Sequence, residues 1–340
     1  MRNLSYLHGK PSTTALYKAH NEDFIVQEDL GYDLDGEGEH VFIYVRKNGY
    51  NTQFIAEQLA KFAEIPAKLA SYAGLKDRNA VTEQWFGLHM PGQQTPDFTK
   101  FNLNDCEILA VTRHRKKLKI GALKGNKFIL TLREISDQQN IEQRLTEIKQ
   151  HGVPNYFGEQ RFGRDNHNIE QAILWANNEI KVNDRKKRGF YLSAARSAIF
   201  NDIVSTRIAE NHHQTIMLGD ALQLTGRGSW FVAIETELNE SKNRLNAGEL
   251  TITAPLVGDN DLGTKNDALL FEQTCINVKW SAFLPLFKRE RLETMRRAIL
   301  LKPSSLSWNW LNESTLQLNF ALPSGCYATA VLREVINQSE

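Results

Sequence analysis

Short blocks of β-branched and aromatic residues, separated by turn-forming residues, run through the first part of the chain. The blocks at residues 24–30, 41–46 and 81–89 predict strands, with a turn at the Gly-Glu-Gly-Glu segment between the first two. Three further blocks predict strands over residues 106–112, 118–123 and 128–133. The Lys-Gly-Asn sequence at residues 124–126 predicts a turn between the last two.

Other segments place their apolar residues at helical spacing. Residues 51–65 carry Ile55, Leu59 and Phe62 on one face, and Pro66 is expected to end this helix. Further helices are predicted over residues 141–151, 166–179, 192–211, 289–301 and 328–337, strands over 306–310 and 315–322, and irregular structure over 219–230. Strands, then helices, then strands again indicate an α+β domain with a helical insertion that begins near residue 152.

Composition narrows the class of protein. With 340 residues, 41% of them apolar and 24% charged, the chain is typical of globular proteins and long enough for two domains. No apolar run approaches the roughly 20 residues of a membrane span, and the first ten residues lack a secretory signal. Cys106, Cys275 and Cys326 are too far apart for a paired-cysteine zinc site or a disulfide framework. We therefore expect a cytoplasmic protein with reduced thiols.

The formal net charge is only +1, but the charges lie in blocks. Residues 108–133 contain Lys and Arg and no acidic residue, and basic groups recur at residues 185–188 and 288–297. Residues 22–39 form an acidic block without Lys or Arg. A neutral chain with charge in blocks is a candidate for binding a polyanion through one positive face. The alternative is that each block is a solvated surface.

One carboxylate has the setting of a catalytic group. The segment G-L-K-D-R-N-A-V-T at residues 74–82 places Asp77 between Lys76 and Arg78, on a turn before a strand. Neighbouring cations keep a carboxylate ionised, which suits a nucleophile or a general base. The alternative is an Asp that only caps its own turn.

A second segment, K-G-N-K-F at residues 124–128, has residues that can bind a base. Asn126 can pair with a base edge through its donor and its acceptor, and Phe128 can stack on a base. The alternative is a hairpin turn with a core Phe. Residues 155–163 combine aromatic residues with Gly, Gln and Arg, a composition that suits binding of single-stranded RNA. The alternative is that their aromatic side chains belong to a core. No phosphate-binding glycine loop or metal-ligand spacing occurs, so we expect no cofactor and no metal.

Together with further segments of the chain, and in the order in which they occur, these motifs closely resemble those of the TruD family of tRNA pseudouridine synthases. The resemblance covers essentially the whole chain and rests on A-H-N-E-D-F at 19–24, G-L-K-D-R-N-A-V-T at 74–82, K-L-K-I-G-A-L-K-G-N-K-F at 117–128, G-V-P-N-Y-F-G-E-Q-R-F-G at 152–163, L-S-A-A-R-S-A-I-F-N at 192–201 and A-T-A-V-L-R-E-V-I-N at 328–337. It implies a V-shaped α+β protein. The pseudouridine-synthase catalytic domain, a mixed and largely antiparallel sheet with helices, would comprise residues 1–151 and 302–340, and a family-specific α/β insertion domain residues 152–301.

The resemblance also implies an activity and a site. Members of the family isomerise uridine in tRNA to pseudouridine without a cofactor, and bacterial members act at position 13 of the D-arm, notably in glutamate tRNA. The family's catalytic Asp maps onto Asp77 and its partner Lys onto Lys18. The residues implied to bind the substrate are Phe24, Asn126, Phe128 and Tyr327, the last where familiar relatives carry Phe.

The expected partner is tRNA, bound by a cytoplasmic monomer that requires no membrane and no protein partner. Two alternatives stay open from the sequence. One is a non-catalytic tRNA-binding or chaperone protein, which would not need the G-L-K-D carboxylate. The other is a nucleosidase that releases free uracil.

Overall fold

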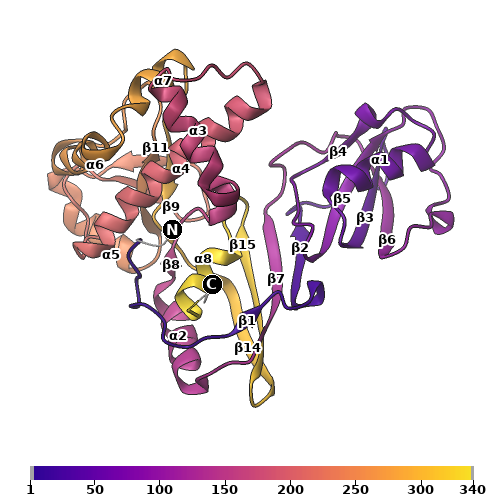
Figure 1. Cartoon of the computed structure of the whole chain (residues 1–340), viewed down its shortest axis with the longest axis horizontal. Helices are drawn as coiled ribbons and strands as arrows, with labels where there is room; N and C mark the ends of the chain where they lie inside the picture. Colours follow the sequence, from indigo (N-terminus) through magenta and orange to yellow (C-terminus); the bar gives the residue numbers. More distant parts are fainter. Residues whose placement is uncertain (1–3, 338–340) are drawn as a thin grey trace. The chain divides into compact units, whose positions relative to one another are not determined.

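The computed structural model describes residues 4–337, and the chain divides into two compact units (Figure 1). The unit that we call the sheet unit comprises Ser12–Leu145, Pro303–Ala328 and the chain from Val335 onward. The helical unit comprises the chain up to Pro11, Thr146–Lys302 and Thr329–Glu334. The ends of the chain are thus shared between the units, and the assignment of catalytic and insertion domains to residue ranges stays a prediction.

Nine strands among the described residues form the mixed sheet of the sheet unit. The order is β14-β15-β7-β2-β5-β3-β6, with β1 paired to β7 and β4 paired to β5. All pairs are antiparallel except β2 and β5. Figure 1 shows how β14 and β15, from the end of the chain, lie beside β7. Their bounds are β1 Leu16–Tyr17, β2 Phe24–Asp29, β3 His40–Asn48, β4 Ala70–Tyr72, β5 Val81–His89, β6 Cys106–His114, β7 Gly125–Arg133, β14 Ser304–Asn312 and β15 Thr315–Pro323.

Helix α1 (Thr52–Phe62) covers part of one face of this sheet. Asn51 caps it by accepting a hydrogen bond from the Phe54 N–H (2.8 Å). Its fully buried Ile55 and Leu59 belong to one core cluster with strand residues such as Val45 and Phe86. The helix therefore forms for the reason that its apolar spacing predicts, because one stripe is removed from water.

The helical unit holds a second, smaller sheet and most of the helices. Its four-stranded antiparallel sheet has the order β10-β9-β11-β12, and β8 pairs with β13. The bounds are β8 Val153–Pro154, β9 Ala221–Leu224, β10 Trp230–Val232, β11 Leu250–Leu256, β12 Met295–Ala298, β13 Leu300–Leu301, α3 His167–Ala176, α4 Arg185–Ala209, α5 Leu238–Asn246, α6 Asn266–Lys279 and α7 Phe283–Arg289. The remaining helices, α2 (Gln138–His151) and α8 (Ala328–Val335), contain points where the chain passes from one unit to the other. Short 3-10 turns lie at Asn21–Asp23, Ala67–Leu69, Phe98–Lys100, Glu159–Phe162, Arg164–Asn166 and Glu235–Glu237.

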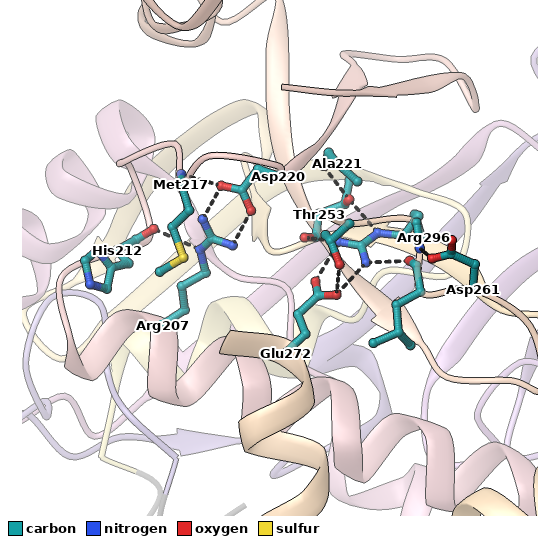
Figure 2. A network of polar contacts seen from close by, with 12 residues as sticks. Arg207, His212, Met217, Asp220, Ala221, Thr253, Asp261, Glu272 and Arg296 are labelled. Atoms are coloured by element: carbon teal, nitrogen blue, oxygen red, sulfur yellow. Dashed lines mark hydrogen bonds and ion pairs between the residues drawn. The ribbon is translucent and has the colours of Figure 1, made fainter. Parts of the chain in front are cut away.

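Two buried ion pairs lie in the helical unit (Figure 2). The Arg207 guanidinium donates to both carboxylate oxygens of Asp220, at 2.8 and 2.5 Å. The Arg296 guanidinium binds Glu272 in the same bidentate way, at 2.8 and 3.0 Å. All four side chains are at most 1% exposed, so each charge depends on its partner.

The predicted α+β class is confirmed, with a mixed sheet and eight helices within residues 4–337. Four local predictions are wrong. Residues 118–123 form a loop instead of a strand, residues 124–126 are no turn because Gly125 opens β7, and residues 289–301 are no helix. Residues 219–230, expected to be irregular, contain β9.

These differences have tertiary causes. Leu118 is buried with Leu30, Phe42 and Ala73, while Ile120 is 85% exposed, so the segment bends instead of pairing. Met295–Ala298 pairs with β11, and this pairing brings the Arg296 side chain to Glu272. Backbone pairing with a distant strand thus outweighs a helical pattern in a short segment.

None of the helices formed by the described residues combines the length and the apolar character that a bilayer crossing requires.

Candidate active site

Asp77 lies in the loop between β4 and β5, and buried polar groups hold this loop in place. The Thr52 hydroxyl, at the start of α1, accepts a hydrogen bond from the Lys76 N–H (2.9 Å) and donates to the Gln84 side-chain oxygen (2.9 Å). The Gln84 amide in turn donates to the Gly74 carbonyl (2.9 Å). Thr52 and Gln84 are at most 1% exposed, so the loop is anchored to a helix and a strand of the rigid core.

The carboxylate of Asp77 binds the ammonium group of Lys18. Lys18 Nζ lies 2.5 Å from Asp77 Oδ2, and the Asn79 N–H donates to Oδ1 (3.0 Å). Lys18 follows β1 with a φ of 58° and also places its Nζ 4.1 Å from the centroid of the Phe24 ring. The Asp77 and Lys18 side chains are 30% and 23% exposed, so a ligand can reach the pair.

This pairing decides the ionisation of Asp77. Partial burial alone would raise the pKa of the carboxyl group. The hydrogen bond and the charge of Lys18, together with the backbone N–H groups of Asn79 and Arg78, outweigh burial and hold the pKa below its ordinary value. Asp77 is therefore a carboxylate at neutral pH, in the state that a nucleophile or a general base requires.

A second lysine contacts the backbone of the loop that carries Asp77. Lys47, on β3, is fully buried, and its Nζ donates to the Tyr50 carbonyl (2.6 Å) and lies 3.4 Å from the Asp77 carbonyl oxygen. Burial lowers the pKa of Lys47 to about 8. Nothing in the sequence marked this residue, because a lysine in a strand pattern is usually exposed.

Asn126 takes part in a polar cluster with Lys76 and Glu28. Lys76 Nζ lies 2.5 Å from Asn126 Oδ1 and 3.1 Å from Glu28 Oε1. Asn126 and Glu28 are direct neighbours across the β7–β2 pairing. Lys76 and Glu28 were not predicted as site residues, although the place of Lys76 beside Asp77 was a signal.

The predicted aromatic residues are found in different settings. Phe24 and Phe128 are 6% and 7% exposed and meet edge to face, with centroids 6.2 Å apart. Phe128 also stacks on Phe320 at 5.4 Å. Tyr327 is partly buried and lies directly before α8. The structure thus joins Phe24 to Lys18 and Asp77, and Phe24 to Phe128, within the sheet unit.

Part of the predicted positive face is neutralised by acidic residues of the same unit. In the sheet unit, two acidic residues of 22–39 bind two arginines of 108–133. Arg115 pairs with Glu37, and Arg133 forms a bidentate bond with buried Asp23 (2.7 Å for the nearest atoms). The acidic block thus has a structural role in the sheet unit.

Lys116, Lys117 and Lys119 stay exposed in the loop after β6. The neighbouring Arg113 is used internally, since its guanidinium donates to the Gly38 carbonyl (2.8 Å) and the Gln93 carbonyl (2.6 Å).

The basic groups of the helical unit are similarly engaged. Arg188 pairs with Glu290, and Arg297 donates to the Asn155 side chain (2.5 Å) while its guanidinium lies 4.3 Å from the Phe157 ring centroid. The segment 155–163 is largely core, with Tyr156 only 1% exposed and Phe157 and Phe162 both 6%. The structural interpretation of its aromatic residues therefore holds.

No cluster of three metal-ligating side chains occurs between residues 4 and 337.

Comparisons with known proteins show the family of the chain. The family model for tRNA pseudouridine synthase D (TruD) matches residues 2–184 and 176–335. The fold is similar to the crystal structure of a Methanosarcina mazei protein assigned as a tRNA pseudouridine synthase D. The TM-score is 0.72 at 23% sequence identity, over 98% of this chain and 94% of the other. Because the family match extends over nearly the whole chain, the protein belongs to the TruD family of tRNA pseudouridine synthases, enzymes that isomerise uridine in tRNA to pseudouridine.

Proposed function

We propose that Asp77 is the catalytic carboxylate and that the target is uridine 13 in the D-arm of tRNA, with glutamate tRNA as a substrate. The observation that carries the catalytic assignment is the Lys18–Asp77 ion pair, at 2.5 Å, on an anchored loop that a ligand can reach. Asp77, Lys18 and Asn126 all belong to the sheet unit, which supports this unit as the catalytic domain and the helical unit as the site of the insertion.

The reaction is an isomerisation that needs one carboxylate. The target nucleotide leaves the base stack and enters the site. Asp77 promotes cleavage of the N1–C1′ bond, either by covalent addition to the nucleoside or by abstracting a proton to give a glycal-like intermediate. The freed uracil turns and forms a C5–C1′ bond. The C5 proton then leaves, and N1 carries a proton in the product.

The neighbouring residues have supporting roles in this proposal. Lys18 keeps Asp77 anionic between turnovers. Phe24 and Phe128 form an apolar wall, since both are largely buried, and Tyr327 can stack on the base through its ring. Asn126 reads the edge of the uracil. A single chain without a protein partner is proposed to suffice, because one unit supplies all these groups.

The test is release of tritium from glutamate tRNA labelled at uracil C5. Wild type is expected to release it and Asp77→Ala to release none while still binding the tRNA. Asp33→Ala, which changes an exposed Asp of the same unit, serves as the matched control and should retain activity. Release by Asp77→Ala would show that another residue is catalytic.

The position is tested separately. Pseudouridine in the treated tRNA is mapped by carbodiimide modification and primer extension, with a transcript carrying cytidine at position 13 as the control. A stop at position 13 that vanishes with the cytidine transcript supports the assignment. A stop at another uridine would refute it.

A further inference from the structure

We propose that Lys76 and Glu28 lock the side-chain amide of Asn126 in one orientation, and that this lock makes the enzyme select uridine over cytidine. The inference rests on the proposed role of Asn126 at the base and assigns a positioning role to two residues that do not themselves need to touch the substrate.

The lock is built from buried, mutually anchored groups. The Lys76 and Glu28 side chains are 8% and 0% exposed, and Lys76 Nζ bridges Glu28 Oε1 (3.1 Å) and Asn126 Oδ1 (2.5 Å). The other oxygen of Glu28 accepts the Trp85 N–H (2.9 Å). The backbone of Lys76 is held in turn by Thr52. Lys76 and Glu28 therefore each have a second attachment that resists movement.

The chemistry of the lysine fixes which way the amide points. An ammonium group only donates hydrogen bonds, so the atom of Asn126 that faces it must be the oxygen. A flipped amide would place an NH₂ donor against the NH₃⁺ group. The amide nitrogen of Asn126 consequently points away from Lys76. It makes no hydrogen bond within residues 4–337, and the side chain is partly exposed, so this donor is free to meet a ligand.

Such an amide matches uracil and mismatches cytosine. The uracil edge offers the O4 acceptor beside the N3–H donor, which suits an NH₂ donor next to the remaining lone pair of Oδ1. Cytosine offers an amino donor beside an N3 acceptor, the reverse pattern. Asn126 could accommodate cytosine only after a flip that breaks its bond to Lys76. A bidentate base contact of this kind gives about tenfold to a hundredfold discrimination.

The experiment compares the affinities of two tRNA transcripts that differ only in the target base, uridine or cytidine. Binding is measured at fixed salt with proteins that all carry Asp77→Asn, so that the uridine is not consumed. The parent is compared with Asn126→Ala, with Lys76→Met combined with Glu28→Gln, and with all three changes together. The paired change avoids leaving a buried carboxylate without its partner.

The parent is expected to prefer the uridine transcript by about tenfold or more. Both Asn126→Ala and the Lys76→Met/Glu28→Gln pair should bring the preference close to one, and the triple variant should go no further. This lack of additivity identifies a shared mechanism. General misfolding would instead weaken the binding of both transcripts equally and leave the ratio of their affinities unchanged.

Three results would overturn the inference: a parent without preference, an unchanged preference in Asn126→Ala, or an unchanged preference in the Lys76→Met/Glu28→Gln pair. The binding ratio does not depend on turnover. If the Asp77→Asn parent shows this ratio but the wild-type protein isomerises no uridine, the catalytic assignment of Asp77 fails while the base-reading lock stands.

Discussion

Replacement of Arg207, one of the two buried arginines in Figure 2, tests whether its ion pair stabilises the helical unit. In Arg207→Met, Asp220 loses both hydrogen bonds to the guanidinium and stays 0% exposed. The carbonyl groups of His212 and Thr215 also lose their donor. Breaking a buried pair by removing one partner destabilises a protein by about 3–5 kcal/mol, because the remaining charge is uncompensated.

The matched control is Arg244→Met in the same unit. Arg244 pairs with Glu249 at 3.0 Å, but the two side chains are 34% and 59% exposed. Exposed ion pairs contribute at most about 1 kcal/mol, so the control should change stability little. At roughly 2–4 °C per kcal/mol for a domain of this size, Arg207→Met should lower the melting temperature by about 10 °C.

The measurements are urea unfolding for the free energy, thermal unfolding for the melting temperature, and hydrogen exchange of peptides from α4 and β9, because two units need not unfold together. Faster exchange should be confined to the helical unit. Adding Asp220→Asn to Arg207→Met should recover part of the lost stability, since the amide carries no charge and keeps an acceptor for the Met217 N–H. An Arg207→Met protein as stable as Arg244→Met would refute the reasoning.

Three further predictions concern charged residues of the sheet unit. Lys18→Met removes the contacts that hold the pKa of Asp77 down, so the acid limb of the pH–rate profile should move to higher pH and kcat should fall more than tRNA affinity; equal losses would contradict this. Lys116→Ala with Lys117→Ala should reduce the slope of log binding constant against log salt by up to about 2, and an unchanged slope would place both residues off the RNA path. Burial lowers the pKa of Lys47 to about 8 in the folded chain, against 10.5 for an exposed lysine, so between these pH values the amine is protonated only in the unfolded chain. Wild type should therefore gain up to about 3 kcal/mol over Lys47→Met between pH 8 and 10.5 in urea unfolding, and a constant difference would contradict this.

The charge pattern shows where sequence reasoning stops. The basic segment 108–133 indicated a surface for polyanions, yet Arg113, Arg115 and Arg133 are bound by neighbours within the sheet unit. The sequence around a Lys or Arg residue does not show whether its side chain faces water or a carboxylate that is distant in the chain. Only the fold shows that the acidic block 22–39 supplies some of those carboxylates.

The sequence by itself determined several local elements and the catalytic candidate. Helical spacing predicted α1, and blocks of β-branched residues predicted β2, β3 and β5, because these signals are contained in neighbouring residues. The G-L-K-D turn made Asp77 a candidate, and the family resemblance of the whole chain singled it out. The tertiary structure alone decided that residues 295–298 pair as a strand, that Lys47 supports the loop of Asp77, and that Lys76 and Glu28 meet at Asn126. The physical reason is that a strand pairing or an ion pair depends on groups brought together from distant parts of the chain. The local sequence pattern around one partner does not indicate where the other lies.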